Sequence, residues 1–138
     1  MLLRGLSAAI VALCIAEFAD AAHVKSFVVK CVDRQEASND DIYLAGVRDG
    51  RPVAWNADFQ EGMCTEHSFD MTDGGSLALD AKSLAELKFD KSLQIVIKEK
   101  DVTGDEVIGT VNVMPGDGMK RLVFKNEDFE YHVEYQVE

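Results

Sequence analysis

The chain has 138 residues, of which 47% are hydrophobic, and this supports one domain with a modest core rather than two domains. Its 25 aspartate and glutamate residues against 14 lysine and arginine residues give a net charge of −11. The basic residues are spread along the sequence without clustering, so the chain lacks the basic patch with which proteins hold nucleic-acid phosphates. An acidic chain of this kind favours cations, basic protein surfaces and solvent.

A run of apolar residues near the start, Leu6–Ala16, has the composition of a secretory signal peptide. An arginine precedes the run, and Ala19–Ala21 supplies the small-x-small pattern of a cleavage site. The alternative, a membrane anchor, requires about 20 apolar residues, and this shorter run is followed by Glu17. We therefore expect residues 1–21 to be removed and residues 22–138 to form a single secreted, extracellular domain.

Two cysteines, Cys31 and Cys64, remain once Cys14 has left with the signal peptide. An even pair in an exported chain predicts one disulfide, and the alternative is two buried thiols. A bridge closing a loop of about 33 residues would stabilise the fold by roughly 3 to 4 kcal/mol. The absence of a Cys-x-x-Cys pair argues against a zinc site or a thioredoxin-like redox site.

The first part of the domain predicts three strands. Apolar residues alternate in Val24–Val32, and a polar loop separates this strand from Ile42–Val47. Arg48–Arg51 contains the Asp-Gly pair typical of a hairpin turn, which leads into Pro52–Trp55. We expect Asn56–Cys64 to form a loop over the edge of the core.

The middle of the chain contains the one segment that predicts a helix. Alternation over His67–Met71 and Leu77–Leu79 predicts two short strands. In Ser83–Phe89, leucines recur at helical spacing behind Ser83, and Glu86 follows three residues later as in a capping box. The segment allows one or two helical turns.

The last part of the chain predicts four strands joined by turns. Alternation is clear in Leu93–Lys98, Val107–Val113 and Arg121–Phe124, and it is cleanest in Phe129–Val137, where every second residue is polar. The turn at Met114–Gly118 is marked by proline and two glycines. Eight or nine short strands at even spacing predict an all-β fold, an antiparallel eight-stranded β-sandwich with at most one short helix.

Two loops of the predicted sandwich concentrate carboxylates. The loop after Leu93–Lys98 carries four of them within eight residues, and a second group borders the loop before Ile42–Val47. Such groups repel each other unless solvent, a basic partner or a hard cation screens them, and calcium binds several oxygen ligands. The alternative is that they are solvated loop residues. Loops at one end of a β-sandwich lie side by side, so the two groups are able to converge.

The motifs in these loops resemble the calcium loops of C2 domains. Glu99-x-Asp101 followed by Glu106 and an apolar-apolar-glycine strand start is similar to the third calcium loop of that family, and Asp33 with Asp40–Leu44 is similar to the first. The resemblance implies a C2-like sandwich in which calcium is the cofactor. It implies these ligands: Asp33, Asp40 or Asp41, Glu99, Asp101 and Glu106. Some secreted effector and toxin modules share this shape outside the cell.

The partner is expected to be an extracellular protein or a cell surface. Membrane docking through calcium is not favoured, because Ala37 and Val102 at the loop tips are small and no large apolar residue lies between the acids. The alternative function is a calcium-independent protein-binding or inhibitor protein whose partner surface contains Tyr43, Trp55 and Phe59. These aromatic residues would otherwise fill the core.

No motif in the sequence indicates an enzyme. None of the histidines, His23, His67 and His132, lies in a cysteine or serine motif, and the chain contains no Gly-x-Ser-x-Gly, His-Glu-x-x-His or phosphate-binding loop. A small sandwich also offers little room for a glycosidase-like cleft. We therefore expect a secreted, non-catalytic module that binds calcium or is stabilised by it.

Overall fold

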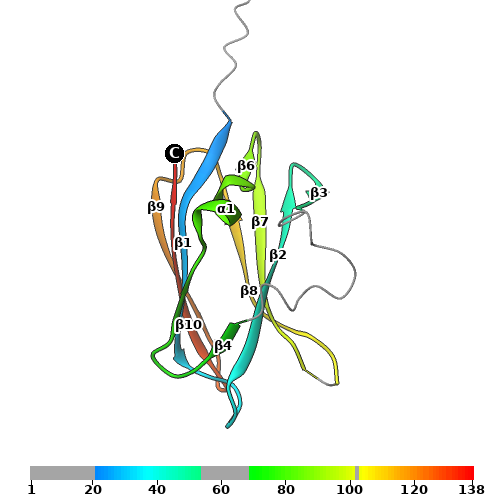
Figure 1. Ribbon diagram of the computed structural model, residues 1–138, viewed down its shortest axis with the longest axis vertical. Helices are drawn as coiled ribbons and strands as arrows, with labels where there is room; N and C mark the ends of the chain where they lie inside the picture. The colour runs from blue at the N-terminus through cyan, green and yellow to red at the C-terminus, as the bar shows by residue number, and fades with distance from the viewer. Residues whose placement is uncertain (1–20, 54–68, 102) are drawn as a thin grey trace, which may run out of the picture.

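Two antiparallel sheets pack face to face and enclose the core (Figure 1). They are seen in a computed structural model that describes residues 21–53, 69–101 and 103–138. The elements, in chain order, are β1 (Ala22–Asp33), β2 (Asp40–Arg48), β3 (Arg51–Pro52), β4 (Phe69–Met71), β5 (Ser76–Ala78), α1 (Ala81–Ala85), β6 (Lys88–Phe89), β7 (Leu93–Glu99), β8 (Glu106–Val113), β9 (Met119–Lys125) and β10 (Glu130–Val137). The predicted all-β sandwich with one short helix is confirmed.

Each sheet has a row of four strands with a long pair at its centre, and one further short strand pairs with a member of that row. The first sheet has the order β5-β1-β10-β9, and β6 also pairs with β1. The second has the order β3-β2-β7-β8, and β4 also pairs with β2. Several of these strands have only two or three residues, so the described residues contain more strands than the eight expected.

Alternation along the long strands places one face of each sheet in the core. On β10, Tyr131 and Val133 are completely buried, whereas the intervening residues are half-buried. On β7, Leu93, Ile95 and Ile97 are equally buried in the facing sheet. The period-two pattern therefore reflects two half-buried sheets whose inner side chains interdigitate.

The edges of the two sheets approach each other where β8 faces β9. A side chain at Gly109, on β8, would place its Cβ 2.3 Å from Cδ1 of Phe124, on β9. The Phe124 ring therefore occupies the space that any other residue at position 109 would fill. This contact brings the two sheets together along one side of the sandwich.

The helix begins earlier in the chain than the sequence predicts. Its N-cap is Asp80, whose Oδ1 accepts a hydrogen bond of 2.8 Å from the amide of Ser83. Ser83 is a buried residue inside the helix rather than its cap. Lys88 and Phe89, which we expected to be helical, form β6 and pair with the beginning of β1. Asp80 acts as the cap because its carboxylate accepts a hydrogen bond from a free amide in the first turn of the helix.

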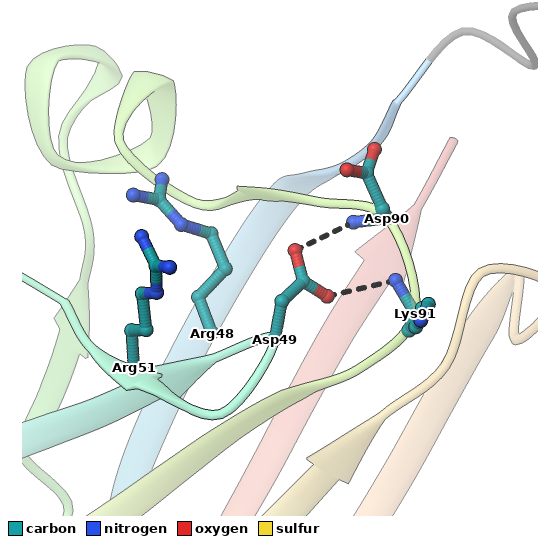
Figure 2. A pocket seen from close by; sticks show the side chains of 5 residues that line it. All are labelled: Arg48, Asp49, Arg51, Asp90 and Lys91. Carbon is teal, nitrogen blue, oxygen red and sulfur yellow. Dashed lines mark hydrogen bonds between the residues drawn. The ribbon is translucent and has the colours of Figure 1, made fainter.

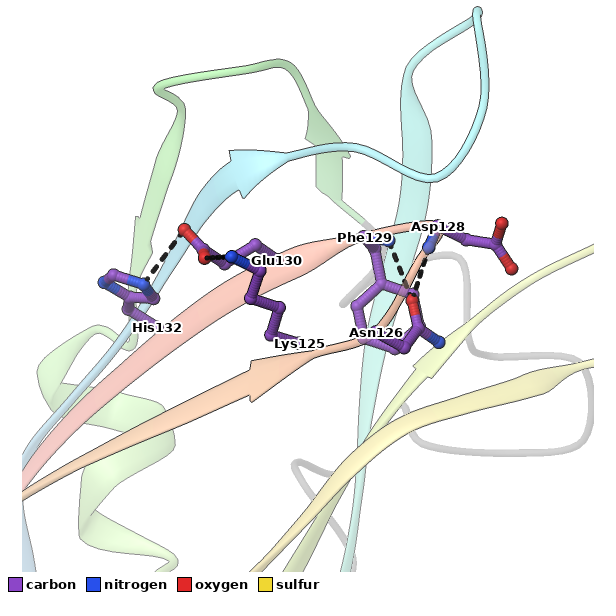
Figure 3. Close-up of polar contacts among 6 residues, drawn as sticks. All are labelled: Lys125, Asn126, Asp128, Phe129, Glu130 and His132. Carbon is purple, nitrogen blue, oxygen red and sulfur yellow. Dashed lines mark hydrogen bonds and ion pairs between the residues drawn. The ribbon is translucent and has the colours of Figure 1, made fainter.

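The Asp-Gly hairpin between β2 and β3 is confirmed. Asp49 and Gly50 both have positive φ, 48° and 80°, which the type I′ turn requires at both central positions. Asn126 stabilises the turn between β9 and β10, because its Oδ1 accepts hydrogen bonds from the amides of Asp128 and Phe129 at 2.8 and 2.9 Å (Figure 3). That turn fixes the start of β10 at Glu130, one residue before Tyr131.

The predicted disulfide is not seen. Cys31 is a free thiol that is 1% exposed on the inner face of β1, beside Tyr131. Burial raises the pKa of this thiol, an effect that a hydrogen bond with Tyr131 partly offsets. The expected partner, Cys64, lies outside the described residues, as do residues 1–20 of the predicted signal peptide. The described part of the chain has no helix long and apolar enough to cross a membrane.

Candidate functional site

Two acidic loops meet at one end of the sandwich, where β1 leads into β2 and β7 leads into β8 (Figure 1). Gln35, in the first loop, donates a hydrogen bond from Nε2 to Oε2 of Glu106 in the second. The amide of Lys100 donates to the carbonyl of Asp41 at 2.8 Å. The loops therefore converge although roughly 60 residues separate them, as loops on a rigid β scaffold do.

Asp40 anchors the first loop from inside the protein. Its side chain is completely buried at the start of β2. Oδ2 accepts hydrogen bonds from the amide of Gln35 at 2.7 Å and from the hydroxyl of Tyr131 at 2.5 Å, and Oδ1 accepts from the amide of Glu36 at 3.1 Å. A buried carboxylate needs such donors to satisfy its oxygens. Asp40 therefore holds the first loop in place through three hydrogen bonds.

Glu99 is the second buried carboxyl group of the site and lacks such donors. It ends β7, is 2% exposed, and lies opposite Ile42 on one side and Glu106 on the other. Within the described residues, no hydrogen bond or ion pair holds its side chain. Burial raises the pKa of Glu99 to about 7, and the charges of Asp40, Glu36, Glu106 and Asp101 add to this effect. Near neutral pH, Glu99 therefore carries a proton in about half of the molecules.

The remaining carboxylates of the second loop surround Glu99 from the solvent side. Asp101 is half-buried and accepts a hydrogen bond of 3.2 Å from Thr103. Glu106 is exposed and bonds to Gln35, as described above. Asp105 is exposed and accepts from the hydroxyl of Tyr43. The hydrogen-bond partners of these acids, Thr103, Gln35 and Tyr43, are all uncharged side chains.

The structure brings together four of the six predicted metal ligands. The pKa of Glu99 is raised by the charges of three other predicted ligands, Asp40, Asp101 and Glu106. Asp33 and Asp41 are not among the charges that raise it. Asp33 is exposed at the end of β1. Asp41 is half-buried and follows Asp40 on the strand, so its side chain lies on the opposite face. Of Asp40 and Asp41, Asp40 is the one whose charge acts on Glu99.

Sequence reasoning missed three residues of the site. Glu36 adds a negative charge near Glu99, and Gln35 joins the two loops. Tyr131 supplies the hydroxyl that holds Asp40. A signal for Tyr131 was present, because a tyrosine on the buried face of a strand needs a partner for its hydroxyl.

The oxygen atoms at this end suit a hard cation, although they do not form a closed site. Among the described residues, no three His, Cys, Asp or Glu side chains are arranged to hold a metal ion. Gln35, however, has a buried amide oxygen, Oε1, without a hydrogen-bond partner. Amide and carboxylate oxygens are the ligands that calcium prefers, so this orphaned acceptor and the unpaired Glu99 carboxyl fit the chemistry of that ion.

Tyr43 is the one residue of the predicted aromatic partner surface that lies within the described residues, and it gives such a surface little support. Tyr43 is only 6% exposed, and its hydroxyl bonds to Asp105, so it offers little area to a partner. Its burial agrees with the alternative that these aromatic residues fill the protein interior. Trp55 and Phe59 lie outside the described residues.

No family model and no curated protein matches this sequence. Solved structures with a similar arrangement include a C2 domain, with a TM-score of 0.44 and 9% identity over 84% of this chain and 96% of that chain. Another match comes from the Cry23Aa1 and Cry37Aa1 binary protein complex, with a TM-score of 0.33 and 12% identity over 85% of this chain and 98% of that chain. Both TM-scores are below 0.5, so neither likeness decides the family or the function.

Proposed function

We propose that the acidic end of this sandwich binds calcium, and that the chain is a secreted, non-catalytic recognition module of C2-like type. Such a module would recognise a host protein or a cell surface, as a secreted effector or toxin-like protein does. The proposal is supported by the fold class, by the two acidic loops that meet at one end, and above all by the unpaired, buried carboxyl of Glu99.

The state of Glu99 carries the argument. A buried carboxylate without donors, close to other negative charges, is unstable, and without a cation it takes up a proton. A calcium ion supplies the missing positive charge and would replace that proton. We therefore expect calcium affinity to rise with pH through the pKa of Glu99, which is about 7.

The residues have different roles in this proposal. Glu99 and Asp101 would supply carboxylate oxygens, and Gln35 would supply its unpaired amide oxygen. The oxygens of Asp40 already accept three hydrogen bonds, so Asp40 contributes its charge and positions the loop rather than acting as a primary ligand. Since the described side chains are not arranged as a closed site, we expect modest affinity, of roughly 10⁻⁴ to 10⁻³ M, as in weak extracellular calcium modules.

Thermal unfolding in EDTA and in millimolar calcium tests the proposal. Calcium at about 10 mM, roughly 10 to 100 times the expected Kd, stabilises by about 1.4 to 2.7 kcal/mol, which raises the midpoint by a few degrees for a domain of this size. Glu99→Gln and Asp101→Asn should remove the rise. Glu127→Gln is the matched control, because Glu127 is exposed in the turn before β10. An equal rise in Glu99→Gln and the control, or no rise in the original chain, would contradict the proposal.

A further inference from the structure

A second charged feature lies at the opposite end of β2, where its hairpin meets the turn between β6 and β7. This end is separated from Asp40 by the full length of the strand, roughly 26 Å. It contains a pocket of about 420 Å³ lined by Arg48, Asp49, Arg51, Asp90 and Lys91 (Figure 2). The sequence spreads its basic residues thinly, and the fold brings three of them together here.

Arg48 and Arg51 form a cross-strand pair on either side of the hairpin turn. Figure 2 shows their guanidinium groups next to each other on one side of the pocket. Like charges directly opposite each other in an antiparallel pair destabilise it, and no described acidic side chain forms an ion pair with either group. The hairpin therefore places two cations together, and neither has a counterion among the described residues.

The two arginines differ in how firmly they are held. Arg48 donates from Nη1 to the carbonyls of Glu86 and Lys88, at 3.1 and 3.3 Å, so its guanidinium is fixed against the turn that follows α1. Arg51 is exposed, and no hydrogen bond within the described residues holds its guanidinium. One fork is thus fixed in place, and the other is held by no partner in the part of the chain that the structure describes.

The two acids of the pocket form no ion pair with the arginines. The pKa of Asp49 is lowered mainly by backbone hydrogen bonds, and the charge of Arg48 contributes to lowering it. The Asp49 carboxylate accepts hydrogen bonds from the amides of Lys91, Asp90 and Ser92, at 2.8, 3.1 and 3.2 Å. These bonds turn it away from both guanidinium groups, and Asp90 lies beyond it (Figure 2). Three basic and two acidic side chains leave the pocket with a positive charge in a chain whose net charge is −11.

We propose that this pocket binds the dianionic, tetrahedral oxyanion group of a small ligand, a phosphate or a sulfate. Guanidinium forks match the oxygens of such groups with parallel hydrogen bonds, and two adjacent forks balance a double negative charge. The Lys91 ammonium adds a third cation from the turn between β6 and β7. This site is distinct from the acidic end, because it lies at the opposite ends of β2 and β7.

Amide chemical shifts of the full chain, followed during titration at constant ionic strength, test the proposal. Inorganic phosphate and sulfate should produce saturable shifts in residues 48–51 and 88–92, whereas acetate should not. Arg51→Gln should weaken binding by roughly tenfold or more, since it removes a charged donor pair. Arg121→Gln is the matched control, because Arg121 is an exposed arginine paired with Glu134 at 2.6 Å. Its binding should be unchanged.

Further ligands and variants identify what the pocket binds and distinguish a loss of binding from a loss of folding. Glycerol 3-phosphate binding more tightly than inorganic phosphate would assign the site to phosphate esters, and equal binding would assign it to the free ion. Arg51→Lys keeps the charge but loses the fork, so it should bind with intermediate affinity. Without phosphate, Arg51→Gln should unfold at a higher temperature than the original chain, because repulsion from Arg48 is removed. Shifts that do not saturate, or an equal loss of binding in Arg121→Gln, would overturn the proposal.

Discussion

The hydroxyl of Tyr131, on β10, donates a 2.5 Å hydrogen bond to Asp40 at the beginning of β2, and so joins the two sheets at the acidic end of the sandwich. Both side chains are completely buried. Burial and the bond to Asp40 raise the pKa of Tyr131, so the hydroxyl keeps its proton and acts as a donor. The charge beside Glu99 therefore depends on a residue of the opposite sheet.

Tyr131→Phe tests this connection. The substitution removes one of the three donors to a buried carboxylate, so we expect a loss of about 1.5 to 3 kcal/mol in the free energy of unfolding. Tyr135→Phe is the matched control, because its hydroxyl bonds at 2.8 Å to Asp117, which is only half-buried. Urea unfolding should show a clearly smaller loss for Tyr135→Phe. Equal losses would mean that the bond to Asp40 contributes no more than an ordinary one.

Glu99 predicts a dependence of stability on pH in the absence of calcium. Its pKa is 4.5 in the unfolded chain and about 7 in the folded protein, so between these values the folded state holds a proton that the unfolded state has released. Stability therefore falls as pH rises from about 4.5 to about 7, by roughly 3 kcal/mol, and then levels off.

Glu99→Gln should remove this dependence, since glutamine resembles the protonated carboxyl at every pH. In EDTA, the variant should match the original chain near pH 4 and exceed its stability at pH 8. Urea unfolding at both pH values measures the difference, and Glu127→Gln should behave as the original chain does. Parallel pH profiles for the original chain and Glu99→Gln would disprove the assignment of the titration to Glu99.

Gly109→Ala should destabilise the contact between β8 and β9. The new Cβ would lie 2.3 Å from the Phe124 ring, which has to move, and overpacking of this kind costs about 1 to 3 kcal/mol. Gly116→Ala, at a position with open space around the glycine, should cost much less. Combining Gly109→Ala with Phe124→Leu should restore part of the lost stability. Full additivity of the two substitutions would show that the ring is not the obstacle.

We expect Cys31 to be a reduced thiol that is protected from alkylation in the native protein. Its thiol is buried and its pKa is raised, so the reactive thiolate is scarce in the native protein. Iodoacetamide at pH 8 should modify Cys31 slowly in the native protein and rapidly in denaturant, as peptide mapping by mass spectrometry would show. Recovery of a peptide that links Cys31 to Cys64 without reductant would contradict the free thiol and support the predicted disulfide.

The long strands were predictable because their signal is local. Alternation in Phe129–Val137 and in Leu93–Lys98 follows from having one face in the core, and the Asp49–Gly50 turn follows from the backbone angles it requires. The helix cap was predicted less well. Both Asp80 and Ser83 are suitable caps, and the choice between them depends on where the chain leaves β5.

The site was predictable in composition but not in geometry. Asp40 and Asp41 are adjacent, and which of them is buried depends on strand register, since a shift of one residue exchanges the two faces. The burial of Glu99 results from its pairing with Ile42 and Glu106, which no local pattern reveals. The cluster of Arg48 and Lys91 likewise requires two turns that are distant in the sequence to meet.

The most direct test of the calcium site is an NMR titration of the Glu99 side-chain carboxyl between pH 4 and pH 9, in EDTA and in millimolar calcium. In EDTA the midpoint should lie near 7. In about 10 mM calcium, roughly 10 to 100 times the expected Kd, it should fall by about one to two pH units, because the ion favours the deprotonated carboxylate. The same midpoint in both solutions would show that calcium does not bind at Glu99, and the proposed function would fail.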